Sequence, residues 1–202
     1  IFNREIEKGW ETNIEKIRFT GKKNKTWQKY VDEKRLEITC GEAPYLVSRY
    51  DTVSGKPLDL KDRIGMLDRK MRVVCENTDS DTEWLKWSER AFQSVYGFEF
   101  QGDSLLIARE NLLASYCDYM EEKLNRHPTE KELINIAKII SWNLWQMDGL
   151  TYTIPYEETV EPFKQVVLFD LHEKEKKCLC IIKDWRAKRI YTFQDLVNKG
   201  SN

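Results

Sequence analysis

The sequence predicts an α/β protein built around an open parallel sheet. Three short runs have the composition of strands, at 35–38, 95–100 and 143–147. Patterns typical of amphipathic helices lie between these runs, the first of them at 68–75. An order of strand, helices, strand, helices, strand favours right-handed crossovers, which make neighbouring strands parallel. We therefore expect a parallel sheet with helices on both faces.

Local signals place individual helices within this order. Ser80 with Glu83, and Thr129 with Glu132, each form a capping box in front of an apolar stripe. Asp103 is expected to begin a long amphipathic helix. The apolar stripe of that helix consists of Leu105, Ala108, Leu112, Tyr116, Met120 and Leu124.

The two ends of the chain are expected to differ from this central region. Residues 1–34 are mostly polar and predict an irregular segment. Residues 156–202 form a C-terminal extension after the last expected helix and strand. Within it, the β-rich runs 165–171 and 178–183 flank the charged turn 172–177, which predicts a β-hairpin.

The composition describes one globular domain, with 202 residues, 41% hydrophobic and 33% charged. The 33 Lys and Arg against 34 Asp and Glu argue against wholesale coating of nucleic acid. No apolar run approaches the roughly 18 residues that cross a bilayer. Five cysteines without Cys-x-x-Cys spacing, with only two histidines, disfavour a zinc site. We expect a cytoplasmic protein with free thiols and neither a membrane nor a metal partner.

The end of the first expected strand carries polar and small residues. Glu37 lies on the strand, and Thr39, Cys40 and Gly41 follow it. An open parallel sheet binds ligands at the carboxyl ends of its strands. A glycine there lets a ligand approach the backbone, and a nearby carboxylate adds an acceptor. Without a histidine nearby in sequence, Cys40 is interpreted as a small residue beside the ligand, not as a nucleophile.

The other two strands end in carboxylates as well. Glu99, followed by Phe100, ends the second strand, where a carboxylate can accept both hydroxyls of a ribose. Asp148 and Gly149 follow the third strand, where an aspartate can accept from the exocyclic amine of a purine. Taken singly, each of these has an ordinary structural explanation. Glu99 could be a surface carboxylate, and Asp148-Gly149 could be only a turn.

Taken in order, these segments resemble the N-terminal half of adenine-specific, S-adenosylmethionine-dependent DNA methyltransferases of type II restriction-modification systems. The resemblance covers residues 35–150. Segment 36–46 is similar to the family's cofactor loop, acidic-x-x-Cys-Gly-x-Gly-x-Phe-Leu. Segment 96–112 is similar to its ribose segment, and 143–150 to its adenine segment. The resemblance implies a partial Rossmann-like class I methyltransferase fold with a C-terminal β-hairpin extension.

The resemblance also implies S-adenosylmethionine as cofactor. The cofactor-binding residues it implies are Glu37, Thr39, Cys40, Gly41, Glu99, Phe100, Asp148 and Gly149. Of these, the residues after the first strand would face the methionine part, Glu99 the ribose and Asp148 the adenine. In the family, the target adenine is flipped out of DNA and receives the methyl group directly from sulfur. DNA would be a partner of the complete enzyme, and a restriction endonuclease, separate or fused, is a further expected partner.

The chain departs from the family pattern in two places. Ala43 and Pro44 replace the second glycine of the cofactor loop, which narrows the freedom of the backbone. The catalytic signature Asn-Pro-Pro-Tyr is absent from the sequence. In related enzymes it would follow closely after a segment like 184–196. We therefore expect the cofactor-binding portion of the enzyme, truncated before the catalytic strand and inactive in isolation.

Two other interpretations stay open. The chain could be a non-catalytic DNA- or protein-binding subunit of a restriction-modification complex. Residues 1–36 carry ten Lys and Arg against six Asp and Glu, although a run of charge is more often a solvated face than a phosphate contact. It could also be a different nucleotide-dependent enzyme that uses the same strand ends. A salt-sensitive, cofactor-independent affinity for DNA would distinguish the first of these.

Overall fold

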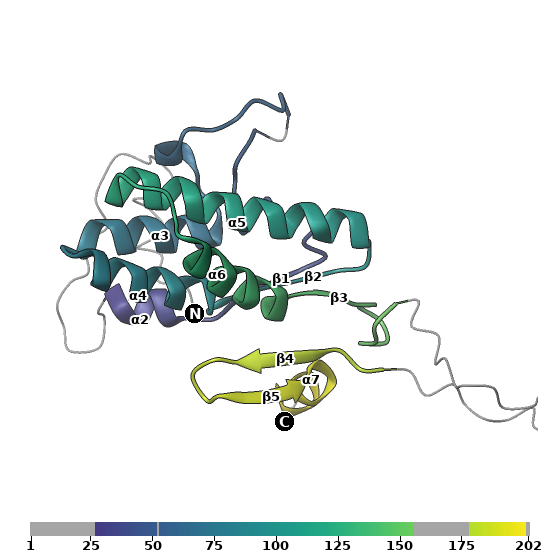
Figure 1. Ribbon diagram of the computed structural model, residues 1–202. Helices are drawn as coiled ribbons and strands as arrows, with labels where there is room; N and C mark the ends of the chain where they lie inside the picture. The colour runs from purple at the N-terminus through teal and green to yellow at the C-terminus, as the bar shows by residue number, and fades with distance from the viewer. Residues whose placement is uncertain (1–26, 52, 156–177, 201–202) are drawn as a thin grey trace, which may run out of the picture.

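A three-stranded parallel sheet forms the centre of the molecule (Figure 1). The structure is a computed structural model that describes residues 27–51, 53–155 and 178–200. The strands β1 (Arg35–Ile38), β2 (Val95–Glu99) and β3 (Leu144–Gln146) lie in the order β1-β2-β3. All neighbours are parallel. The prediction of three parallel strands at these positions is confirmed.

One face of the sheet is covered by a layer of helices (Figure 1). These are α2 (Trp27–Asp32), α3 (Met66–Asn77), α4 (Asp81–Phe92), α5 (Gly102–Leu124) and α6 (Glu130–Asn143), and a 3₁₀ turn, η1 (Leu60–Asp62), precedes α3. Their apolar side chains share one core with Val95 of β2 and Leu144 of β3. Because side chains alternate along a strand, every second residue of β2 faces this layer.

The capping signals mark the helix starts correctly. The Thr129 hydroxyl accepts from the Glu132 amide, and the Glu132 carboxylate accepts from the Thr129 amide at 2.7 Å, which completes the predicted box before α6. The Ser80 hydroxyl accepts from the Glu83 amide before α4. These polar side chains satisfy amide groups that have no partner within the helix.

Helix α2 corrects the expectation of an irregular segment at residues 27–32, whereas the rest of that expectation, at residues 1–26, lies outside the described residues. The helix is only six residues long, which is too short for a helix to be stable by itself, so tertiary packing must stabilise it. Val31 is fully buried, and the Trp27 ring packs edge-on against Trp87 with 4.8 Å between ring centroids. The buried Lys70 ammonium of α3 donates to the Val31 carbonyl and to the Ser94 hydroxyl, which ties α2 to the start of β2.

The C-terminal unit is a hairpin followed by a helix. Strand β4 (Ile181–Asp184) pairs antiparallel with β5 (Arg189–Thr192), and α7 (Phe193–Gly200) follows directly. A hairpin in the extension is therefore confirmed, but its predicted strands are wrong where they can be compared. Residues 181–184 pair with 189–192, whereas the expected partner 165–171 and its turn lie outside the described residues.

This unit covers part of the sheet face opposite the helix layer (Figure 1). Phe98 of β2 and Met147 pack there against Cys180 and Phe193. The ring centroids of Phe98 and Phe193 are 4.8 Å apart. The prediction of helices on both faces is confirmed unequally in the described residues, where five helices cover one face and α7, with the hairpin, lies on the other.

Polar contacts fasten the unit to the rest of the chain. Lys34 and Asp184 form an ion pair at 2.6 Å, and the Trp185 indole donates to the buried Asn143 side chain at 2.7 Å. Arg186 contacts Asp32 of α2. The C-terminal extension and the sheet therefore form one packed body in the described residues. None of the helices in that part of the chain is long and apolar enough to cross a membrane.

Candidate functional site

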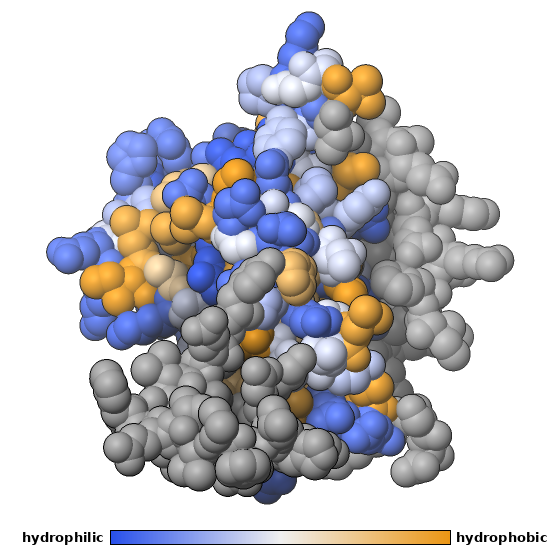
Figure 2. Space-filling model, turned by 90° about the vertical axis from the view of Figure 1, so that its right-hand side faces the viewer, coloured by the Kyte–Doolittle hydropathy of each residue, from blue (hydrophilic) through white to orange (hydrophobic). Residues whose placement is uncertain are grey.

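The residues that follow the three strands come together at one edge of the sheet. The Cys40 amide donates to the Phe98 carbonyl at 2.8 Å, and the Met147 amide donates to the Glu99 carbonyl at 2.9 Å. The turns after β1 and β3 therefore flank the end of β2. Figure 2 views the side of the molecule toward which the strands point, where hydrophobic and hydrophilic side chains are interspersed.

Glu99 is the centre of this edge. One carboxylate oxygen, Oε2, accepts from the Gly41 amide at 2.7 Å. The other, Oε1, accepts from the Phe100 and Gln101 amides at 2.9 and 3.0 Å. A half-buried carboxylate thus links the loop after β1 to the end of β2. Each carboxylate oxygen has two lone-pair sites, so capacity remains for a ligand hydroxyl.

Glu37 lies on the helix side of β1, opposite Gly97 of β2. Its side chain is nine-tenths buried, with 9% of its surface exposed. Burial raises the pKa of the carboxyl group to about 7, and the amides of Leu46 and Tyr45 offset this in part. Within the described part of the chain, its Oε2 atom is buried and makes no hydrogen bond. An unsatisfied buried oxygen of this kind calls for a partner.

Cys40 packs beside both carboxylates. Gly97 makes room for it, since a Cβ atom at Gly97 would lie 3.1 Å from the Cys40 sulfur. Burial, and then the charges of Glu37 and Glu99, raise the pKa of the Cys40 thiol to about 12. The thiol is therefore protonated at neutral pH, which disfavours a role as nucleophile.

The loop after β1 has the backbone of a glycine-rich turn. Thr39, Gly41 and Ala43 have φ angles of 57°, 54° and 62°, all in the left-handed region. The family's second glycine therefore corresponds to a position that does need a positive φ, and Ala43 adopts it with a Cβ atom. Ala43 is fully buried, so its methyl group occupies space inside the loop. The conformation costs about 1 kcal/mol relative to glycine.

Asp148 also lies at this edge but folds into its own turn. Its Oδ1 atom accepts from the Leu150 and Thr151 amides at 2.8 and 3.2 Å. That arrangement is an Asx turn. Gly149 is exposed beside it, and Phe100 is 37% exposed after β2. The structure therefore brings Glu37, Cys40, Gly41 and Glu99 into one cluster, and places Asp148 at the neighbouring strand end.

Sequence reasoning missed Arg109 of α5. Its Nη2 atom donates to the Leu144 carbonyl at 2.7 Å, and its buried Nε atom has no partner among the described residues. Burial lowers the pKa of Arg109, and the Cys40 thiol offsets this, so the guanidinium lies in the electrostatic surroundings of the cluster. A cation within an amphipathic helix gives no sequence signal that separates it from a solvated surface residue.

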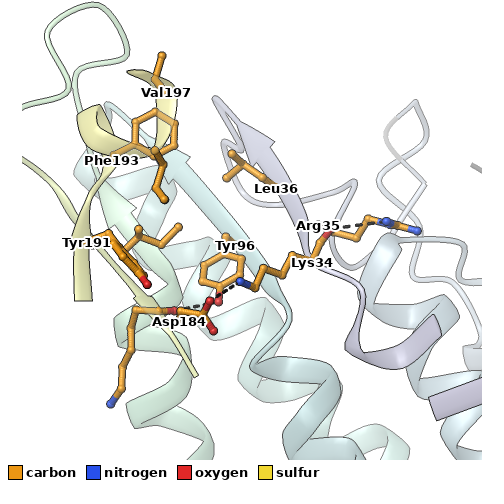
Figure 3. Close-up of a pocket in the computed structure, with 11 residues that line it drawn as sticks. Lys34, Arg35, Leu36, Tyr96, Asp184, Tyr191, Phe193 and Val197 are labelled. Atoms are coloured by element: carbon orange, nitrogen blue, oxygen red, sulfur yellow. Dashed lines mark hydrogen bonds and ion pairs between the residues drawn. The ribbon is translucent and has the colours of Figure 1, made fainter. Parts of the chain in front are cut away.

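A second feature that the sequence did not reveal is a pocket of about 310 Å³ between the C-terminal unit and the face of the sheet that the helix layer does not cover. Figure 3 shows Leu36 and Tyr96 on one side of it and Tyr191, Phe193 and Val197 across from them. The pocket begins beside the amino end of β1, away from the strand ends that carry Glu99 and Asp148. The apolar side chains reach it from segments that are far apart in sequence, which no local pattern indicates.

Comparisons with family models, with curated proteins and with solved structures give no match to this chain. Among the described residues, no group of three or more His, Cys, Asp or Glu side chains is arranged to hold a metal ion. The assignment of the edge therefore rests on its own geometry and on the resemblance of its motifs.

Proposed function

We propose that this chain is the S-adenosylmethionine-binding portion of an adenine-specific DNA methyltransferase of a restriction-modification system. The observation that carries the proposal is the Glu99 carboxylate at the tip of β2, held by the Gly41 amide of the loop after β1. A carboxylate at the end of the central parallel strand, beside a left-handed glycine, suits the ribose of a nucleoside cofactor. The strand order, with β2 between β1 and β3, gives that ligand one continuous edge.

The residues present fit such a cofactor in four respects. Glu99 keeps one lone-pair site, on Oε2, for a ribose hydroxyl, and Asp148 stands at the adjoining strand end for an adenine amine. The unpartnered Oε2 atom of Glu37 offers an acceptor near the first loop. Phe100 supplies an exposed apolar ring next to Glu99. When bound, S-adenosylmethionine would supply an activated methyl group, and these residues would bind and orient it.

The missing Asn-Pro-Pro-Tyr signature limits what this chain is proposed to do. Holding the target adenine requires a hydrogen-bond acceptor for its amine and an aromatic ring to stack on it. In the family these belong to the absent signature. We expect no methyl transfer to DNA by this chain alone, and incorporation of labelled methyl at a substantial rate would refute the proposed need for that signature.

Calorimetric titration with S-adenosylmethionine tests the binding site. Binding should be lost in Glu99→Ala and at least tenfold weaker in Asp148→Ala, because a buried ligand group then lacks its acceptor. Glu110→Ala, on the exposed side of α5, is the matched control and should bind like the parent chain. Unchanged binding in both site variants would remove the site assignment.

The pocket on the opposite face supports a second candidate, a protein-binding subunit of a restriction-modification complex. Leu36 beside the pocket is 40% exposed and Ile38 is 55% exposed. Exposed apolar side chains next to a pocket are typical of protein contact sites. This candidate predicts a stable complex with another subunit of the restriction-modification system, whose affinity does not change when S-adenosylmethionine is added. Ile38→Lys should disrupt that complex without affecting cofactor binding.

A further inference from the structure

The pocket between the C-terminal unit and the sheet is a cavity apart from the carboxyl edge. Its volume of about 310 Å³ is at the lower end of the range of small-molecule sites. Leu36 of β1 and Tyr96 of β2 form its sheet side, and Phe193 and Val197 of α7 lie across from them (Figure 3). Leu36 and Leu196 line the pocket and are 40% and 37% exposed, so it opens to solvent beside them. A small molecule can therefore reach the pocket without detachment of the C-terminal unit.

The walls of the pocket are mainly apolar. The side chains of Ile182 from β4, Tyr191 from β5 and Leu196 from α7 complete the lining on the side of the C-terminal unit. A ligand in contact with these walls removes apolar surface from water on both sides of the pocket, which is favourable. The walls therefore suit a ligand with an apolar body.

One end of the pocket carries charged groups. Lys34 and Asp184 form an ion pair there at 2.6 Å, beside the Tyr96 hydroxyl (Figure 3). The other carboxylate oxygen of Asp184, Oδ1, accepts from the Arg186 and Ala187 amides at 2.9 and 3.0 Å. Both oxygens of Asp184 are therefore engaged. The Lys34 ammonium has three donors, and among the described residues it donates only to Asp184.

Arg189 adds a second cation on the same side of the hairpin. It is the direct partner of Asp184 in the antiparallel register, and paired residues point to the same face. Tyr191 lies two residues further along β5, hence on that face as well, and it lines the pocket. The Arg189 side chain is exposed, and it makes no hydrogen bond or ion pair within the described ranges.

The other charged groups near the pocket are directed elsewhere. The Arg35 guanidinium pairs with Glu33 at 2.8 Å. The Lys183 ammonium lies over the Trp185 ring, 4.0 Å from its centroid. Asp195 of α7 is exposed and does not line the pocket. These groups therefore bring no further carboxylate of the described chain to the end where the ion pair lies.

We propose that this pocket binds a small amphipathic anion, an aromatic or short alkyl body that carries a single carboxylate or sulfonate group. The apolar body lies between Tyr96 and Phe193. The anionic group lies at Lys34 and Arg189, because two cations there face one carboxylate and the surplus of positive charge attracts an anion. The inference does not depend on the proposed function, since neither Glu99 nor any other residue of the carboxyl edge lines the pocket.

Two matched fluorescent probes separate the apolar and the anionic parts of such a ligand. 8-Anilinonaphthalene-1-sulfonate carries one sulfonate group, and N-phenyl-1-naphthylamine has the same rings without it. Titration of the full chain should give one saturable site for both. The sulfonate should bind about threefold to fivefold more tightly, the factor typical of an exposed ion pair. Saturating S-adenosylmethionine should displace neither probe, because the carboxyl edge is a different site.

Substitutions test each part of the pocket. Arg189→Glu should remove the preference for the sulfonate, whereas Lys188→Glu, in the adjoining turn, changes the net charge equally and should keep it. Leu36→Trp and Leu196→Trp each place an indole at the mouth of the pocket and should weaken the binding of both probes by roughly tenfold or more. Leu106→Trp, at an exposed position of α5, is the control for the added indole. Circular dichroism of each variant verifies the fold.

The outcomes decide between the site and its alternatives. A sulfonate preference that is lost in Arg189→Glu but kept in Lys188→Glu, together with loss of both probes in the two indole variants, supports the proposal. Equal affinity of the two probes for the parent chain overturns the anionic class of the ligand. Absence of binding, or binding that persists in both Leu36→Trp and Leu196→Trp, overturns the pocket as the site. None of these outcomes bears on the cofactor site, which Glu99→Ala tests separately.

Discussion

Replacement of Glu37 by glutamine should change how the stability of the protein depends on pH. Burial raises the pKa of Glu37 from 4.5 to about 7 in the folded protein. Between these values the folded protein holds the proton and the unfolded chain does not. The free energy of unfolding therefore falls as pH rises through this window. The stabilisation that comes from the proton held by Glu37 in the folded protein is fully present below pH 4.5 and is lost above pH 7.

The magnitude follows from the size of the shift. Each pKa unit corresponds to 1.36 kcal/mol, so the full shift of Glu37 is equivalent to about 3 kcal/mol. Partial solvation of the carboxyl group reduces this to about 2 kcal/mol. Glutamine at this position does not titrate. The stability of Glu37→Gln relative to the parent chain should therefore rise by about 2 kcal/mol between pH 4.5 and pH 8.

Urea unfolding followed by tryptophan fluorescence at fixed ionic strength measures this difference. The free energy of unfolding of the variant also differs from that of the parent by a constant amount at every pH, because an amide group replaces a carboxyl oxygen. Only the change of this difference with pH is therefore diagnostic. Glu110→Gln should show no such change. A difference between Glu37→Gln and the parent chain that is the same at pH 5 and pH 8 would show that Glu37 does not titrate in this window.

Three further predictions concern the loop, the core and the thiols. Gly41→Ala should destabilise the protein by about 1 kcal/mol in urea unfolding through its φ of 54° alone, since no atom lies within 4 Å of the added Cβ, and an unchanged free energy of unfolding would contradict the loop geometry. Asn143→Ala should lower the free energy of unfolding by about 3 kcal/mol, because the buried side-chain amide of Asn143 donates to the Phe92 and Val95 carbonyls and accepts from the Trp185 indole. A thermal midpoint within about 2 °C of that of the parent chain would argue against this network. Iodoacetamide at pH 8 should modify the exposed Cys178 before the buried Cys40, and mass spectrometry that found the reverse order would contradict the raised pKa of Cys40.

The sequence predicted the elements that have strong local signals. The Thr129–Glu132 box and the aromatic, β-branched run at 95–100 place α6 and β2 because capping and strand composition act over a few residues. Helix α2 is only six residues long and depends on the packing of Val31 and Trp27 against other helices. The strand pairing of β4 could not be predicted either, because several runs nearby have similar composition and the choice depends on packing against Phe98.

The candidate site was predictable in position but not in chemistry. Parallel strands bring their carboxyl ends to one edge, so the approximate location of Glu37, Glu99 and Asp148 follows from the order of elements. How each carboxylate is used depends on its contacts. Glu99 is bound by the Gly41 amide, Asp148 by its own turn, and Glu37 is left with an unpartnered oxygen. Arg109, which shares this space, comes from a helix whose sequence pattern gives no indication of its role.

The packing of β2 explains why the edge can be well ordered before a ligand arrives. Tyr96 and Phe98 face the C-terminal unit, while Gly97 faces the helix layer and receives the Cys40 side chain. The orientation of Glu99, at the end of the same strand, is fixed by a backbone that is buried on both faces. A ligand at Glu99 therefore meets a scaffold whose conformational entropy is already lost. If the proposed cofactor binds at Glu99, Phe98→Ala, which loosens β2 from the face that packs against the C-terminal unit, should weaken that binding in calorimetric titration.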